Sequence, residues 1–196
     1  SSFRWFNSNK KYGCMRMISI KSQQGVGLVE VLVALLLLAV GVLGYSILQF
    51  RAIDASSEAL TRSQGVLVLR SLAEGIRANP TGQANYPAAV RNYTNITALP
   101  TVPTTSCFNP AVICTPAQAA TYDAYFAAKT AFELGMNITM TACPGTTTAP
   151  VQRQCLFAAW GDTVLSVTGT SADISQCMST TGVYVSNSKC LMMEAY

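Results

Sequence analysis

The stretch Gln24-Gly25-Val26-Gly27-Leu28-Val29-Glu30 stands directly before an uncharged apolar run that extends from Val31 to Phe50. A helix of this length spans about 30 Å, the thickness of the hydrocarbon core of a bilayer. The run can therefore cross a membrane. Glu30 is unexpected at its edge, because an ionised side chain costs on the order of 3 kcal/mol at the centre of a membrane segment and less near the edge. We expect Glu30 to have a partner.

Basic residues are concentrated before this run. Five of the 13 Lys and Arg residues precede Val26, and no acidic residue accompanies them. Removal of residues 1–25 would leave eight basic against nine acidic residues, so the formal charge of +4 does not indicate a nucleic-acid partner. The positive-inside rule places the basic segment on the cytoplasmic side of the membrane and the residues after Phe50 on the opposite side.

Two ordinary explanations of the run fit it poorly. A cleaved secretory signal has a shorter apolar core that ends in small residues, whereas this core is long and Gly44-Tyr45-Ser46 is a poor cleavage site. A plain signal anchor explains the length and the flanking charge but neither Gly25 nor Glu30. Met15 and Met17 are natural start positions, so we treat the first fourteen residues as an upstream extension.

The segment resembles the class III leader of type IV pilins and their relatives. Gly25, Val26, Leu28 and Glu30 match the family pattern position by position, although the family usually has Phe where Val26 stands. The resemblance implies that a prepilin peptidase removes residues 1–25, that the new amino terminus is methylated, and that Leu28 and Glu30 serve assembly. The apolar run is most similar to the PilV group of minor pilins, and it shares Glu-Val-Leu-Val-Ala-Leu with the pseudopilins of type II secretion.

A physical argument also gives Glu30 a role between subunits. Its carboxylate cannot readily satisfy an amino terminus one turn away in the same helix, but a staggered neighbouring helix could bring the two groups together. A buried charge is costly without a partner and tolerable in an ion pair, so this pair would favour the one register of neighbouring helices that brings the two groups together. The alternative, that Glu30 only lies in the headgroup zone, stays open.

The helix is expected to continue beyond the membrane to Ala78, because Asn79-Pro80 supplies a stop. Spacing places two groups of apolar side chains on different faces of the exported half: Ile53, Leu60 and Leu67 on one, and Leu69, Leu72 and Ile76 on the other. Two apolar faces imply two partners, the chain's own globular domain and neighbouring subunits. The spacing also predicts the ion pairs Glu58–Arg62 and Arg70–Glu74.

The composition changes after the long helix. Residues 81–116 are rich in Thr, Asn, Ala and Pro, and they predict an extended surface connection. Thr115-Pro116-Ala117-Gln118 then predicts a helix start, with an N-cap hydroxyl, a first-turn proline and a capping glutamine. We expect the second helix from Ala117 to Leu134, with Gly135 as its stop.

The sequence after Gly135 predicts a β-hairpin. Met136–Thr141 alternates apolar and polar residues with period two, and Cys155–Trp160 is a second apolar segment. Further short strands are expected at 164–168 and at either 183–186 or 191–196.

Six of the seven cysteines lie in the exported part, and the seventh, Cys14, falls in the leader. An even number in an exported domain indicates a disulfide framework, although six cysteines allow fifteen pairings. From chain order we expect the pairs Cys107–Cys114, Cys143–Cys155 and Cys177–Cys190. A zinc site is a weak alternative, because the sequence has no CxxC motif and no histidine.

The sequence offers little of the chemistry of an enzyme. Without histidine, Ser-His-Asp and Cys-His arrangements are excluded. There is also no phosphate-binding loop, dinucleotide fingerprint or metal-ligand cluster. We therefore expect no catalytic residue, no cofactor and no metal.

These observations predict an α+β protein, and the resemblance implies the pilin fold: a long N-terminal helix packed on a small antiparallel sheet with disulfides. The expected parts are a removed leader (1–25), a membrane and assembly segment (26–50), an exported amphipathic helix (51–79) and a disulfide-stapled globular domain (80–196). By resemblance the chain is a single-pass protein of the bacterial inner membrane, with its C-terminus in the periplasm, and later a part of the cell-surface pilus.

The resemblance further implies a minor pilin that helps to prime pilus assembly and sits at or near the filament tip. Its partners would be other minor pilins, the major pilin, the prepilin peptidase and methylase, the inner-membrane assembly machinery and membrane lipid. A type II secretion pseudopilin is the first alternative. A DNA-uptake or adhesive tip receptor is the second, although no nucleic-acid partner is expected.

Overall fold

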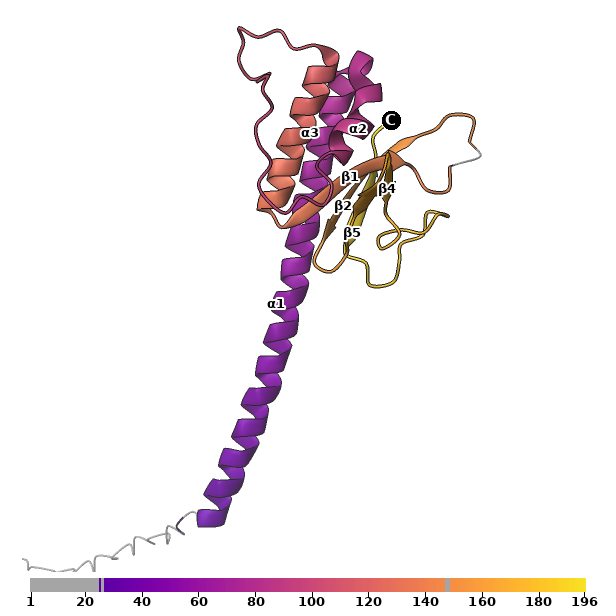
Figure 1. Cartoon of the computed structure of the whole chain (residues 1–196). Coiled ribbons are helices and arrows are strands. Elements are labelled where there is room, and N and C mark those ends of the chain that lie inside the picture. The colour runs from indigo at the N-terminus through magenta and orange to yellow at the C-terminus, as the bar shows by residue number, and fades with distance from the viewer. Residues whose placement is uncertain (1–24, 26, 147–148) are drawn as a thin grey trace, which may run out of the picture. The chain divides into compact units, whose positions relative to one another are not determined.

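The computed structural model describes residues 25, 27–146 and 149–196 (Figure 1). Its helices are α1 (Leu28–Ala78), the 3-10 helix η1 (Pro80–Asn85), α2 (Tyr86–Arg91) and α3 (Pro116–Glu133). Its strands are β1 (Met136–Ala142), β2 (Gln154–Trp160), β3 (Ser166–Thr168), β4 (Ser171–Asp173) and β5 (Cys190–Glu194). The chain divides into two compact units, residues 1–49 and 50–196, which we describe separately. The α+β class predicted from the sequence is confirmed.

Helix α1 is continuous from Leu28 to Ala78, as predicted. In the first unit, the large apolar side chains from Leu28 to Leu48 are exposed. This part of α1 is long and apolar enough to cross a membrane. The helix ends before Pro80, because proline restricts the residue that precedes it and has no backbone N–H to donate.

The region after α1 is more regular than the sequence predicted. The prediction of an extended connection over residues 81–116 is wrong for the first part of this region, because that part forms η1 and α2. The cause is a buried apolar face, because Tyr86, Ala89 and Val90 follow helical spacing and enter the core. Residues 92–115 alone form a connection without regular helix or strand.

Helix α3 begins at the capping box that the sequence predicted. Thr115 N donates to Gln118 Oε1 at 2.9 Å, and Gln118 N donates to Thr115 Oγ1 at 3.3 Å. Pro116 is the first helical residue, where its missing N–H would have no partner in any case. Gly135 follows the helix with φ of 70°, a conformation that glycine adopts without strain.

The second unit contains a three-stranded antiparallel sheet in the order β1-β2-β5. The predicted hairpin is confirmed, since Met136 pairs with Trp160 and Thr141 pairs with Cys155. Strand β5 pairs with the other edge of β2, so the later of the two C-terminal alternatives forms the strand.

The other predicted strands differ from the structure. The segment 183–186 contributes only an isolated bridge between Met178 and Tyr184. Strand β3 occupies the end of the predicted strand 164–168 and pairs with β4, which the sequence did not predict. Gly169 lies in the turn between them with φ of 62°.

Two apolar clusters lie on opposite faces of the sheet. We call the first the helix-side cluster, because it joins α1, α2 and α3 to one face of the sheet. The second, the disulfide-side cluster, consists of Cys143, Cys155, Phe157, Ala159, Leu165, Cys177, Met178 and Cys190. Along β2, Leu156 and Ala158 enter the first cluster, whereas Phe157 and Ala159 enter the second. Burial on both faces explains why β2 is apolar at every position from Cys155 to Trp160 rather than alternating.

Candidate functional site

The start of α1 carries the residues predicted for processing and assembly. Gly25 is exposed, and Leu28 exposes 77% of its surface. Glu30 lies in the first helical turn, where its N–H donates to Gly27 O at 2.9 Å. A carboxylate at this end of a helix is favoured by the helix dipole. Val26 and residues 1–24 lie outside the described residues.

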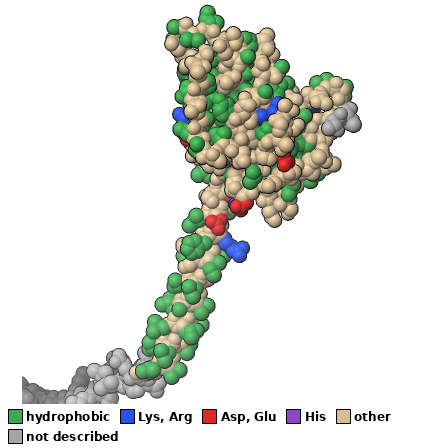
Figure 2. Space-filling view, viewed as in Figure 1, with side chains coloured by type: hydrophobic (Ala, Val, Ile, Leu, Met, Phe, Trp, Pro, Cys, Tyr) green, Lys and Arg blue, Asp and Glu red, His purple; other side chains and the backbone are tan. Residues whose placement is uncertain are grey.

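The Glu30 carboxylate forms no ion pair with any residue that the structure describes. Hydrophobic side chains cover much of this part of α1 (Figure 2). Within the part of the chain that the structure describes, Glu30 therefore has no charged partner. The roles of Gly25, Val26, Leu28 and Glu30 stay predictions.

The second half of α1, residues 51–78, has the two apolar faces that its spacing predicted. Leu69, Leu72 and Ile76 are buried in the helix-side cluster. In contrast, the side chains of the other face are 59 to 65% exposed: Ile53, Leu60 and Leu67. The chain's own domain therefore covers one face, and no described residue covers the other.

A hydrogen-bonded group joins α1, α2 and α3. Tyr86 is fully buried, and its hydroxyl donates to Asp123 Oδ2 at 2.6 Å and lies 3.2 Å from Gly75 O. Asn79 Nδ2 donates to Pro116 O at 2.8 Å and to the Tyr86 hydroxyl at 3.4 Å. Burial and the bond to Asp123 raise the pKa of Tyr86, so its hydroxyl stays protonated and can donate. At position 75, a Cβ atom would lie 3.0 Å from Asp123 Oδ2, which explains the glycine.

A second group joins α1 to the end of β2. Trp160 Nε1 donates to Glu58 Oε2 at 3.0 Å. Arg62 Nη2 lies 3.8 Å from Glu58 Oε1, and the guanidinium carbon is 6.0 Å from the centre of the Trp160 ring. The predicted ion pair Glu58–Arg62 is confirmed. The contacts of Trp160 and Tyr86 were not predicted. Trp160 is 102 positions from Glu58 and Tyr86 is 37 positions from Asp123, and local sequence patterns do not indicate contacts over such separations.

Half of the cations after Phe50 take part in ion pairs. The predicted pair Arg70–Glu74 is wrong, because Glu74 instead lies 3.3 Å from Arg77, three residues away on the same helix. The other ion pairs besides Glu58–Arg62 are Lys129–Glu133 at 3.8 Å and Arg153–Glu194 at 3.3 Å. Pairing of four of the eight cations with acids disfavours a continuous basic surface for nucleic acid.

The six cysteines after Phe50 form three disulfides, in the pairs expected from chain order: Cys107–Cys114, Cys143–Cys155 and Cys177–Cys190. The second pair joins the end of β1 to the start of β2 and closes the loop between them. The third ties the segment before β5 to the first residue of that strand.

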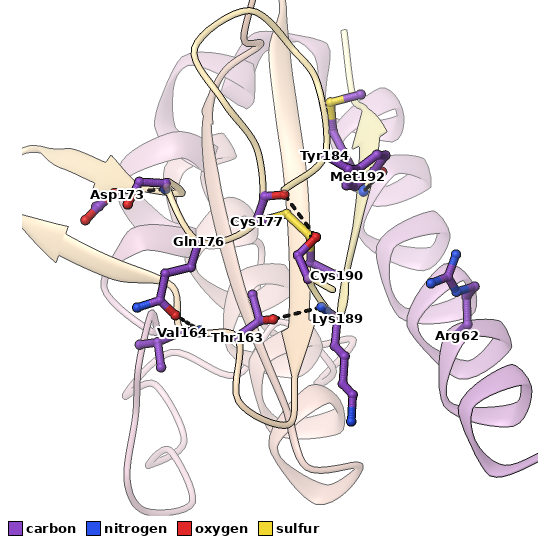
Figure 3. Close-up of a disulfide and its surroundings, with 12 residues drawn as sticks. Arg62, Thr163, Val164, Asp173, Gln176, Cys177, Tyr184, Lys189, Cys190 and Met192 are labelled. Carbon is purple, nitrogen blue, oxygen red and sulfur yellow. Dashed lines mark hydrogen bonds between the residues drawn. A yellow bond between two sulfur atoms is a disulfide. The ribbon is translucent and has the colours of Figure 1, made fainter. Parts of the chain in front are cut away.

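Hydrogen bonds fix the loops around Cys177–Cys190 (Figure 3). Lys189 N donates to Thr163 Oγ1 at 2.8 Å, and Val164 N donates to Gln176 Oε1 at 2.9 Å. Met192 N donates to the hydroxyl of Tyr184 at 3.0 Å on the outer side of β5. A segment with little regular structure is thereby held in place by side chains and a disulfide.

The side chains described above make apolar contacts, hydrogen bonds, ion pairs and disulfides. No group of three or more His, Cys, Asp or Glu side chains is placed to bind a metal among the described residues. A hollow of about 480 Å³ beside β4 is mainly apolar and contains one carboxylate, Asp173. Ser175 N donates to this carboxylate at 2.9 Å and lowers its pKa.

Two family models match adjoining parts of the chain. The model of the prokaryotic N-terminal methylation motif matches residues 20–46, which include Gly25, Leu28 and Glu30. The model described as type IV pilin Tt1218 matches residues 47–125, from the second half of α1 into α3. No curated protein and no solved structure matches the chain. The chain is therefore a type IV pilin-like protein, with an N-terminal methylation motif and an apolar helix that anchors it in a membrane.

Proposed function

We propose that this pilin is a minor subunit that helps to prime type IV pilus assembly and sits at or near the filament tip. The observation that carries the proposal is the exposed face of α1 formed by Ile53, Leu60 and Leu67. Aliphatic side chains in a row at helical spacing are typical of a surface that another protein covers. The resemblance of the anchor to the PilV group supports the minor role.

Processing and orientation belong to the same proposal. The prepilin peptidase cuts after Gly25, and the new amino terminus at Val26 is methylated. The Glu30 carboxylate then pairs with the amino terminus of a neighbouring subunit, and residues 80–196 form the periplasmic domain. The partners are other minor pilins, the major pilin, the inner-membrane assembly machinery and membrane lipid.

Deletion of the gene followed by complementation with a tagged copy tests this function. A priming subunit predicts fewer pili in the deletion strain, restored numbers on complementation, and immunogold label at filament ends. Label at regular intervals along the shaft would contradict the tip position. A loss of protein secretion with normal pili would instead support the pseudopilin alternative.

A DNA-uptake receptor is the less favoured function, because half of the exported cations already have acidic partners. Binding of DNA by the purified protein, with the steep salt dependence of phosphate contacts, would reverse this preference.

A further inference from the structure

The loop closed by Cys107–Cys114 holds apolar side chains in solvent. Phe108 is 73% exposed and Ile113 is 96% exposed. The ring of Phe108 packs only partly, with its centre 5.6 Å from that of Tyr122 and 6.3 Å from that of Phe126, both on α3. Phe126 is itself exposed. Apolar side chains that a closed loop keeps in water are typical of an interaction surface.

A groove lies next to these rings, between α1 and α3. Its volume is about 200 Å³, and its lining from α1 consists of Ser71, Leu72 and Gly75. Phe108, Tyr122 and Phe126 form much of the other side, with Asp123 as the one lining carboxylate. That carboxylate already accepts a hydrogen bond from the buried Tyr86. The groove therefore presents mainly apolar surface to an incoming side chain.

We propose that this surface, made of Phe108, Ile113, Tyr122, Phe126 and the adjoining groove, binds the exported half of the N-terminal helix of a neighbouring pilin-like subunit. We call it the Phe108 surface. The inference rests on the proposed function as a filament subunit and names the contact that such a subunit would make.

The chemistry of the occupant can be argued from this chain's own helix. Its exposed face carries Ile53, Leu60 and Leu67 at seven-residue intervals, so that their side chains lie along one line. An amphipathic helix that lays such a row into an apolar groove is a recurrent mode of recognition. The Phe108 surface has no cation among its members, which disfavours nucleic acid as the occupant.

The proposed contact also has the symmetry that a filament needs. The helix face and the Phe108 surface are different parts of the chain, so their contact is heterologous. A heterologous contact that does not close into a ring generates an open helical assembly, whereas a contact between two identical patches stops at a dimer. A subunit that offers its helix face to one neighbour and its Phe108 surface to another can extend a filament.

Photocrosslinking in pilus-producing cells tests the contact directly. The full-length protein carries p-benzoylphenylalanine at position 108, and the matched control carries it at position 183, where Val183 is 64% exposed on a different loop. Products from the membrane and filament fractions are digested and identified by mass spectrometry. We expect the position-108 product to contain a peptide from the exported half of an N-terminal pilin helix. Products with lipid, with a non-pilin protein or only with a globular domain would overturn the proposal.

Charge insertion provides an independent measurement. Phe108→Asp and Ile113→Asp should each reduce incorporation into filaments or minor-pilin complexes at least tenfold in competition with wild type. Val183→Asp should compete equally. All three side chains are largely exposed, so the far-ultraviolet circular dichroism and the thermal midpoint should stay close to those of wild type.

The outcomes separate this inference from the function on which it rests. If Phe108→Asp and Ile113→Asp are incorporated like wild type, the docking inference is wrong and the minor-pilin function stands. If the wild-type protein itself occurs in neither filaments nor minor-pilin complexes, the proposed function is wrong. The position-108 products from the membrane fraction still decide the docking inference in that case.

Discussion

Removal of one buried hydroxyl should measure how strongly α1, α2 and α3 are joined. In Tyr86→Phe the ring remains in the core, but Asp123 Oδ2 loses the donor that lies 2.6 Å away. A hydrogen bond to a charged group contributes about 1.5–3 kcal/mol to stability. Asp123 is only partly buried, so water can replace part of the bond. We expect a loss of about 1.5 kcal/mol, at the lower end of that range.

This loss corresponds to a fall of about 3–6 °C in the thermal midpoint for a domain of this size. The measurement is near-ultraviolet circular dichroism of the full chain in detergent micelles during heating, which reports the packing of the aromatic residues in the second unit. Tyr122→Phe is the matched control, because the structure shows no hydrogen bond from the Tyr122 hydroxyl to a described residue. Its midpoint should stay within about 1–2 °C of wild type.

The same variant tests the raised pKa of Tyr86. An unfolded tyrosine ionises near pH 10, whereas the buried one keeps its proton to higher pH. The folded state therefore binds more protons above pH 10, and the Tyr86 contribution to stability declines there by up to about 1.4 kcal/mol per pH unit. Below pH 10 the contribution is fully present. Tyr86→Phe should show a shallower alkaline decline than Tyr122→Phe.

Two results would refute the reasoning about Tyr86. The first is a thermal midpoint for Tyr86→Phe equal to that of wild type. The second is a coupling near zero between Tyr86→Phe and Asp123→Asn in a double-mutant cycle, because contacting partners should show at least about 0.5 kcal/mol.

Three further predictions concern processing, assembly and the disulfides. Gly25→Leu should block cleavage and leave a membrane-bound precursor, whereas the wild-type chain should begin at Val26 by N-terminal sequencing. Glu30→Ala should insert and fold normally but enter filaments less efficiently than wild type in a competition experiment, because the inter-subunit ion pair is lost. Replacement of Cys177 and Cys190 by serine should lower the free energy of unfolding by about 2–4 kcal/mol in denaturant titrations.

Each of these has an outcome that contradicts it. A mature protein that starts between residues 40 and 50 would exclude the prepilin leader. Equal incorporation of Glu30→Ala and wild type would remove the assembly role of the carboxylate. Detection of free thiols at Cys177 and Cys190 without reductant, or equal stability of the double-serine variant, would count against the third disulfide as a structural element.

The sequence predicted well those elements whose signals are local. Thr115, Pro116 and Gln118 occupy three of the four positions of the capping box, and α3 begins there. The alternation in Met136–Thr141 and the apolar run Cys155–Trp160 likewise predicted the hairpin that β1 and β2 form. The pairing of the cysteines followed chain order because each disulfide closes a short loop, with separations of 7, 12 and 13 residues.

The sequence predicted less well wherever distant contacts decide the structure. The helix α2 has only six residues, and its buried Tyr86 depends on Asp123 and Gly75 from other helices. The exposed state of Phe108 follows from its position in a closed loop beside α3. Local propensity contains neither fact. For the N-terminal segment, the signal in Gly25 and Glu30 is chemical rather than structural, and the fold of one chain does not test it.

The division of the second unit into two clusters has a consequence for how this protein can diversify. The helix-side cluster includes no member from residues 161–189, whereas the disulfide-side cluster takes Leu165, Cys177 and Met178 from that segment. Substitutions and insertions on the outer side of these loops therefore leave the helix packing intact, while Cys177–Cys190 returns the chain to β5. The outer surface of residues 161–189 can therefore change without a change in the packing of the helices, so the part of the chain that meets solvent there and the part that packs on α1 can evolve separately.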